Sequence, residues 1–130
     1  MITPAPCLCG HPTAYAACCG HWHDGPLQGL APGAAALMRS RYSAFVLERA
    51  DYLLATWHPS KRPARLAFEP GLRWLGLTVQ RCLQQDEAHA TVHFIARSKL
   101  AGRTSRWVET SRFVREAGRW WYVDGDLAAP

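Results

Sequence analysis

The spacing of apolar residues predicts two helices in the first half of this 130-residue chain. Across residues 34–46 apolar side chains recur at intervals of three and four, which places them on one face of an α-helix. A second, shorter helix is predicted from Arg49 or Asp51 to Trp57, with Asp51 as its N-cap. Pro59 cannot continue a helix, so the helical pattern ends before it.

After residue 71 the pattern changes to runs rich in β-branched and aromatic residues, which is typical of strands. The preceding segment, residues 58–71, contains three prolines and is predicted to be mostly loop, with a short helix near residues 65–68. Successive hairpins form an antiparallel meander, and helices followed by such a sheet indicate an α+β fold with the helices on one face. Short turn sequences separate the four predicted strands, which cover residues 72–84, 88–99, 103–116 and 120–126.

Alternation along each predicted strand divides its side chains between two faces. In the first strand Leu75, Leu77 and Val79 are expected to share one face, opposite Trp74. The third strand carries apolar side chains on both faces, so the alternation does not say which face is inner. Cys82 stands alone in strand sequence and is expected to be a small buried apolar side chain.

Four of the five cysteines lie within thirteen residues, as Cys7-x-Cys9, eight further residues, and then Cys18-Cys19. Zinc binds thiolates at about 2.3 Å, and a structural zinc site takes four ligands. Two disulfides are the alternative for an even number of clustered cysteines. No basic region followed by an apolar stretch opens the chain, so we expect no secretory signal and reduced, cytosolic thiols. The pattern therefore predicts a structural Zn²⁺ on Cys7, Cys9, Cys18 and Cys19.

Adjacent cysteines can both bind one ion only where the backbone turns sharply. His21 and His23 follow closely in the sequence and are the expected substitutes for Cys19. Four thiolates would leave no open coordination position, whereas catalytic zinc usually has three protein ligands. The metal would supply folding free energy to a segment with few apolar residues. We therefore predict a zinc knuckle over residues 1–25 and an α+β domain over residues 26–130.

The cysteine pattern, with Gly10 and Tyr15 between its halves, resembles the SEC-C zinc motif, which also forms the C-terminal tail of the SecA translocase motor. The SEC-C pattern usually continues Gly-Ser-Gly, whereas Gly10 is followed here by His11-Pro12. Four further segments are similar to the bacterial YchJ family, namely residues 36–46, 51–59, 73–77 and 118–125. The resemblance to this family implies an NTF2-like cone, in which N-terminal helices pack on a curved antiparallel four-stranded sheet, and it implies no particular reaction.

NTF2-like domains often hold a pocket between the sheet and the helices, and such pockets are mostly apolar with a few polar groups. The candidate pocket residues are Tyr42, Trp57, His58, Trp74, His93, Glu109, Ser111, Arg112 and Trp121. His93 and Glu109 on neighbouring strands are a candidate acid–base pair, with a surface pair as the alternative. A cap contact at a helix end is the alternative for His58. Arg39 and Arg41 are expected to form ion pairs or to bind an anion or partner.

Charge and motifs leave two functions open. The formal net charge of +5 falls to about +3 when four thiolates bind one Zn²⁺, and the scattered arginines favour acidic partners without establishing them. The chain carries no nucleotide-binding or hydrolase motif, so the catalytic residues stay unassigned. We expect a cytoplasmic protein without a membrane span. It would be either a binding module for a protein or ribonucleoprotein partner, or a small-molecule-binding protein or enzyme that uses the pocket.

Overall fold

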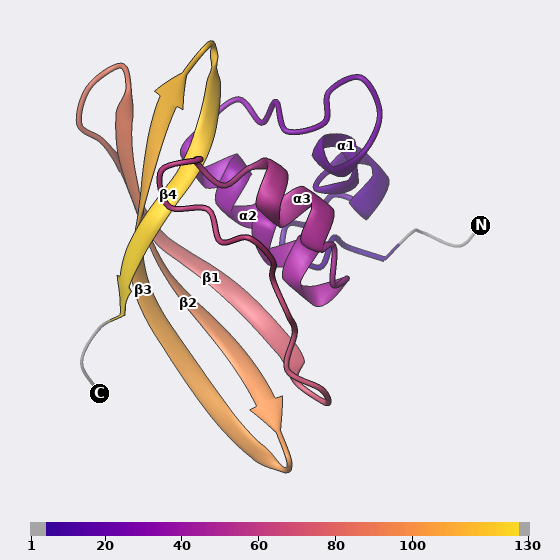
Figure 1. Ribbon diagram of the computed structural model, residues 1–130. Coiled ribbons are helices and arrows are strands. Elements are labelled where there is room, and N and C mark those ends of the chain that lie inside the picture. The colour runs from indigo at the N-terminus through magenta and orange to yellow at the C-terminus, as the bar shows by residue number, and fades with distance from the viewer. Residues whose placement is uncertain (1–4, 128–130) are drawn as a thin grey trace.

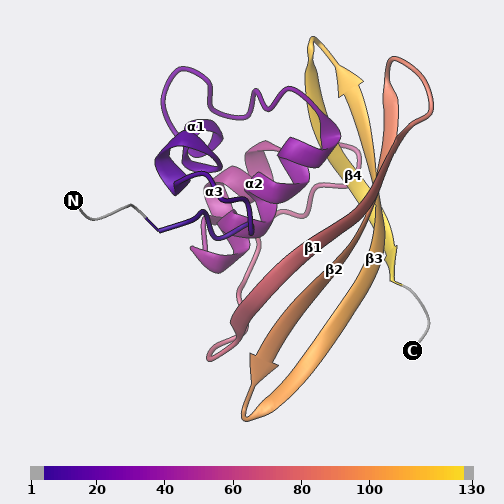
Figure 2. The same ribbon diagram turned by 180° about the vertical axis from the view of Figure 1, so that it is seen from behind.

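The computed structural model describes residues 5–127, so the outer ends of the two expected domains, residues 1–4 and 128–130, lie outside it. Helices cover one face of a twisted four-stranded sheet, and the N-terminal segment lies on the far side of the helices from the sheet (Figures 1 and 2). In chain order the elements are η1 (Tyr15–Ala17), α1 (Gly20–His23), α2 (Ala34–Val46), α3 (Ala50–Ala55), β1 (Arg73–Gln84), β2 (His89–Leu100), β3 (Arg103–Glu116) and β4 (Arg119–Leu127).

Helix α2 has the bounds that its periodicity predicts, and it packs against β1, β2 and β4. Helix α3 differs from the prediction at both ends. Its N-cap is Arg49, whereas Asp51 lies in the first turn and accepts hydrogen bonds from the Arg49 side chain. The helix ends at Ala55, and the following Trp57 pairs with Tyr122 of β4 in an isolated bridge, in which the Tyr122 N–H donates to the Thr56 carbonyl and the His58 N–H donates to the Tyr122 carbonyl.

The short helix expected near residues 65–68 is absent, and these residues follow an irregular path. Leu66 and Phe68 pack instead against a small core cluster formed by Ala44, Tyr52 and Leu53. A single helical turn fixes several backbone dihedrals for one hydrogen bond, so it forms only where packing supports it. Here the packing is made by two side chains from an extended segment.

The sheet confirms the predicted antiparallel meander, with strand order β1-β2-β3-β4. Two of its hairpins turn through a pair of residues with positive φ, namely Ala101-Gly102 at 51° and 78° and Ala117-Gly118 at 53° and 76°. Two successive positive φ angles match a type I′ turn, whose twist fits that of the flanking strands. The first turn joins β2 and β3 in one continuous register, whereas the pairing of β3 with β4 shifts by one residue between Arg112 and Phe113.

Burial identifies the inner face that the sequence left open. On β2 the inner face carries Val92, Phe94 and Ala96, and on β3 it carries Ser111 and Phe113, all of them buried. Helix α2 covers this face (Figure 2). The concave side of the sheet and α2 therefore enclose the main core.

The side chains at the start of β1 do not alternate as predicted. Trp74 pairs with Ser98 and Gly76 with Arg97, so Leu75 is an extra residue in a β-bulge. As a result, Trp74 packs against the helices and Leu75 is exposed, although Leu75 was expected on the same face as Leu77. Beyond a second irregularity, Cys82 is exposed rather than buried, because the far end of β1 extends past the helices.

The cysteine segment shares the main core with the sheet. Cys7, Cys9 and Cys19 belong to the same buried cluster as Leu37 and Met38 of α2. The boundary at residue 25 stays a prediction, which unfolding measurements can test. Among residues 5–127, no helix combines the length and the apolar character that a membrane crossing requires.

Candidate metal centre and candidate pocket

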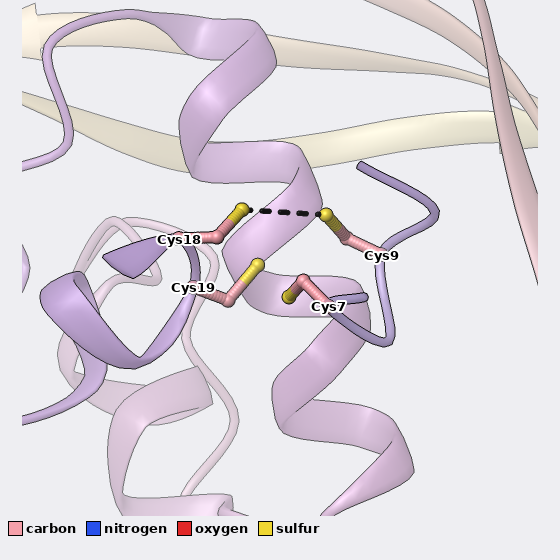
Figure 3. A group of neighbouring side chains, drawn as sticks. All are labelled: Cys7, Cys9, Cys18 and Cys19. Carbon is pink, nitrogen blue, oxygen red and sulfur yellow. Dashed lines mark hydrogen bonds between the residues drawn. The ribbon is translucent and has the colours of Figure 1, made fainter. Parts of the chain in front are cut away.

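The four clustered cysteines point toward one another (Figure 3). All four Sγ atoms lie within 4.8 Å of one another, and the Sγ atoms of Cys9 and Cys18 are 3.7 Å apart. Four thiolates placed tetrahedrally at about 2.3 Å from one ion would be separated by about 3.8 Å. A disulfide would require about 2.05 Å. The donor set therefore fits a tetrahedral, thiolate-bound metal ion.

Two tight turns bring the sulfur atoms together. In the first, the N–H of Gly10 donates to the carbonyl of Cys7 at 3.0 Å, and Gly10 adopts a φ of 93° that favours glycine. In the second, Cys18 ends the 3₁₀ helix η1 with φ −122° and ψ −108°, and Cys19 is the N-cap of α1. This reversal is the sharp turn that two adjacent ligands need, so both thiols face the same point.

The two histidines considered as substitutes lie outside this group of thiols. His23 is fully buried, its Nε2–H donates to the carbonyl of Ser40 at 2.7 Å, and its Nδ1 accepts from the Tyr15 hydroxyl at 2.7 Å. His21 is exposed, and its ring lies edge-on to Trp22. Within residues 5–127 the candidate metal-binding group contains the four cysteines and no imidazole.

Hydrogen bonds among the thiols concentrate negative charge on one sulfur. The hydrogen bond from Cys19 is the main cause that lowers the pKa of Cys9 to about 4. Burial raises the pKa of Cys18 to about 11, and the hydrogen bond to Cys9 raises the pKa of Cys19. A metal ion would have to displace the remaining thiol protons, since thiolates are the ligands.

A cavity of about 160 Å³ lies between α2 and the inner face of the sheet. Five of the candidate pocket residues line it, namely Tyr42, Trp57, Trp74, Glu109 and Ser111. The sequence did not indicate the other lining residues, which are Met38, Arg41, Phe45, Phe94, Ala96, Trp107 and Tyr122. The cavity is thus walled by aromatic rings and contains one arginine and one carboxylate.

Arg41 is the principal functional candidate that sequence reasoning did not place in the pocket. Its Nη1 donates to the Leu53 carbonyl and to Thr56 Oγ1, both at 2.7 Å. Its guanidinium carbon lies 4.3 Å from the ring centre of Tyr122 and 5.2 Å from that of Trp57. Burial lowers the pKa of Arg41 to about 10, so the side chain is still protonated at neutral pH.

The helical spacing contained a signal for this position. Arg41 is four residues after Leu37, three after Met38 and four before Phe45, so it falls on the apolar stripe of α2. A charged residue on the buried stripe of a helix needs compensation inside the fold. No ion pair supplies it among residues 5–127, in contrast to the expected pairing with acidic residues.

Glu109 occupies the cavity together with Ser111, whose hydroxyl donates to the Glu109 Oε2 at 2.5 Å. Gly125 of β4 lies directly beside this carboxylate. A Cβ at position 125 would lie 2.5 Å from Glu109 Oε2, so the absence of a side chain at Gly125 leaves space for the carboxylate.

Strand register explains why His93 does not meet Glu109. Phe94 is opposite Glu109 and His93 is opposite Thr110, so alternation places His93 on the other face of the sheet. There its Nδ1 forms a hydrogen bond with Thr110 Oγ1 at 2.8 Å. The expected acid–base pair is not assembled.

The remaining three candidates also lie outside the cavity. His58 contacts Glu116 through Nε2 at 2.9 Å and Ser60 through Nδ1 at 2.7 Å. Arg112 donates to the two exposed carboxylates of Asp124 and Asp126, each at 2.6 Å. Trp121 packs under the Arg119 guanidinium at 4.4 Å. These contacts are surface interactions that support the sheet and the loop beside it.

Comparisons with known proteins agree with this architecture. Residues 33–125 match the family model described as "YchJ, middle NTF2-like domain". UPF0225 proteins of Bordetella parapertussis and Bordetella bronchiseptica are each 57% identical to this chain, across 96% of it and 95% of their own length.

Two solved structures resemble the whole chain. The solution structure of a SEC-C motif containing protein from Rhodopseudomonas palustris has a TM-score of 0.82 and 30% identity, covering 95% of this chain and 99% of that one. The crystal structure of a SEC-C motif containing protein from Psychrobacter arcticus has a TM-score of 0.76 and 28% identity, covering 99% and 85%. The expected NTF2-like α+β fold with an N-terminal cysteine motif is confirmed, and the chain belongs to the YchJ family of SEC-C motif proteins.

Proposed function

We propose that this protein binds a small molecule in the cavity between α2 and the sheet. The observation that carries the proposal is the buried guanidinium of Arg41, whose hydrogen bonds within residues 5–127 all start from Nη1. Burying a charge is costly, and a core that served packing alone would be at least as stable with an apolar side chain there. A mostly apolar cavity with a few converging polar groups is the usual form of a ligand site.

The cysteine cluster is a structural zinc site in this proposal. Four thiolates occupy every position of a tetrahedral ion, so the metal would bind no substrate. Ser43 and Arg39 of α2 face the cluster, with Ser43 Oγ 3.8 Å from Cys7 Sγ and Arg39 Nη1 donating to the Cys9 carbonyl. Thiols kept reduced for metal binding fit a cytoplasmic location.

Indole N–H signals in proton–nitrogen NMR spectra can test the pocket directly. Trp57 and Trp107 line the cavity, whereas Trp121 lies outside it and serves as an internal control. On titration of the metal-loaded protein with one-ring compounds, we expect the Trp57 and Trp107 signals to shift and the Trp121 signal to stay. The apparent Kd should be on the order of 1 mM or below for such small ligands.

A blocking variant makes the test specific to the cavity. Ala96 lines the cavity and is buried, so Ala96→Leu fills part of the volume with apolar atoms. The variant should fold and lose the ligand-induced shifts. Shifts that persist in Ala96→Leu, or that occur only at Trp121, would contradict a ligand site in this cavity.

A second candidate is the binding module for a protein or ribonucleoprotein partner. Exposed leucines of the N-terminal segment favour it, since Leu8, Leu27 and Leu30 are 43%, 39% and 43% exposed. Leu8 lies between two cysteines of the cluster, on a tight turn. A Leu8→Ser variant should capture less of any partner in a pull-down than the wild type, with equal zinc content in both. Equal capture would remove the support for this candidate.

A further inference from the structure

The polar groups of the cavity specify a class of ligand, and the inference rests on the proposed function. We infer that the cavity binds a neutral, planar, one-ring heterocycle that presents a hydrogen-bond acceptor to Arg41 and an adjacent donor to Glu109. Cyclic amides present such a pair of groups, because their ring carbonyl and ring N–H are neighbours.

The charge balance of the cavity argues for a neutral ligand. Arg41 contributes one positive charge and Glu109 one negative charge to the same lining. Burial lowers the pKa of Arg41, and the nearby negative charge of Glu109 raises it. No direct ion pair joins the two side chains among residues 5–127. A charged ligand would leave one charge without compensation in a half-buried site, whereas a neutral one keeps the sum at zero.

The hydrogen-bonding groups of the cavity argue for a ligand that both accepts and donates hydrogen bonds. The guanidinium of Arg41 only donates, and its Nε and Nη2 have no protein acceptor among the described residues. The Glu109 carboxylate only accepts; Oε2 is used by Ser111, and Oε1 has no donor within residues 5–127. A ligand must therefore accept at one point and donate at another.

The walls and the volume argue for one flat ring. Trp74, Trp107 and Tyr42 line the space, and the ring centre of Trp74 lies 6.4 Å from that of Trp107 and 6.0 Å from that of Tyr42, so the aromatic walls are packed against one another. The cavity volume of about 160 Å³ is close to that of an engineered apolar cavity of about 150 Å³ that binds benzene. A single six-membered ring matches this size.

The test compares four one-ring compounds on the intact, metal-loaded protein. They are 2-pyridone as the neutral cyclic amide, benzoate as the anion, benzylamine as the cation and benzene as the apolar ring. We expect 2-pyridone to bind at least about tenfold more tightly than the other three, because it alone satisfies both polar groups without adding charge. The NMR signals of Trp57 and Trp107 report whether each compound enters the cavity.

Two glycine variants separate the role of Glu109 from the shape of the cavity. Gly125→Ala places a methyl group against the Glu109 carboxylate and displaces the end of that flexible side chain. Gly76→Ala is the matched control, because its Cβ would meet nothing within 4 Å. We expect the affinity for 2-pyridone to fall about tenfold in Gly125→Ala and in Glu109→Gln, and to be unchanged in Gly76→Ala.

The outcomes distinguish this inference from the proposed function. Tighter binding of benzoate, benzylamine or benzene in the same cavity overturns the ligand class and leaves a small-molecule site. Equal affinity for 2-pyridone in Gly125→Ala, Glu109→Gln and the wild type also overturns it. If the Trp57 and Trp107 signals move with none of the four compounds and with no other one-ring compound, the proposed function itself fails.

Discussion

Arg41 and His23 are both buried polar side chains, and the fold accommodates them in different ways. His23 satisfies both ring nitrogens, one as a donor to the Ser40 carbonyl and one as an acceptor from Tyr15, which requires the neutral imidazole. Arg41 stays charged and is held by hydrogen bonds from one nitrogen and by two aromatic faces. The first residue is a structural element of the core, and the second has hydrogen-bonding capacity left for a ligand.

The state of His23 predicts a pH dependence of stability. Burial, with a smaller contribution from Arg49, lowers the pKa of His23 below its ordinary value of 6.5. Between that value and the lower folded pKa, the unfolded chain binds a proton that the folded chain does not, so stability falls as the pH falls. From pH 7 to pH 5 we expect the free energy of unfolding to drop by up to about 1.4 kcal/mol per pH unit from this residue.

Chemical denaturation at several pH values measures this slope, and His23→Gln is the comparison. Glutamine can still donate to the Ser40 carbonyl but does not titrate. Other titrating groups are common to both proteins, so the difference between their slopes isolates His23. Equal slopes in the wild type and the variant would show that His23 takes up its proton as readily in the folded protein as in the unfolded chain, which contradicts the prediction.

Helix α2 is the element shared by the two candidate sites. One side of the helix carries Arg39 and Ser43, which contact the cysteine segment. Another side carries Arg41 and Tyr42, which line the cavity. A change in the cysteine cluster is therefore expected to reach the cavity through this helix.

Replacing one cysteine tests both the metal and this connection. Cys9 is fully buried, so Cys9→Ser removes a ligand from the centre of the cluster. Elemental analysis should find about one zinc per wild-type chain and less than about half of that in the variant. The variant should lose at least about 2 kcal/mol of stability, and its Trp57 and Trp107 signals should broaden or shift.

The exposed Cys82 provides the matched control, since it lies on β1 outside the cluster. Cys82→Ser should keep its zinc, its stability and its indole signals. A wild-type protein purified without zinc, or a Cys9→Ser variant that matches Cys82→Ser in all three measurements, would contradict a structural metal site.

At the scale of the whole molecule, α2 lies between the sheet and the cysteine segment (Figures 1 and 2). The sheet covers one side of the helix, and buried cysteines with η1 and α1 cover part of the other. Because both layers pack against this helix, we expect both to contribute to its stability. This arrangement explains how a short segment without an apolar core of its own becomes part of the main core.

Local signals in the chain were sufficient for the four strands, for α2 and for the grouping of the four cysteines, whereas binding of zinc by these cysteines stays a prediction. The three- and four-residue spacing from Ala34 to Val46 predicts α2, because a helix repeats within a few residues. The Ala101-Gly102 and Ala117-Gly118 turns mark hairpins, because a turn is also specified by a few neighbouring residues. The four cysteines are close in sequence, so their spacing alone indicates one shared site.

Contacts between distant segments could not be derived from such spacing. Trp74 enters the cavity because an extra residue at Leu75 shifts the register of β1, and no local pattern marks that bulge. His93 turns away from Glu109 because the pairing of β2 with β3 places Phe94 opposite the carboxylate. A shift of one residue moves a side chain to the other face of a sheet, so pocket membership depends on strand pairing rather than on residue type.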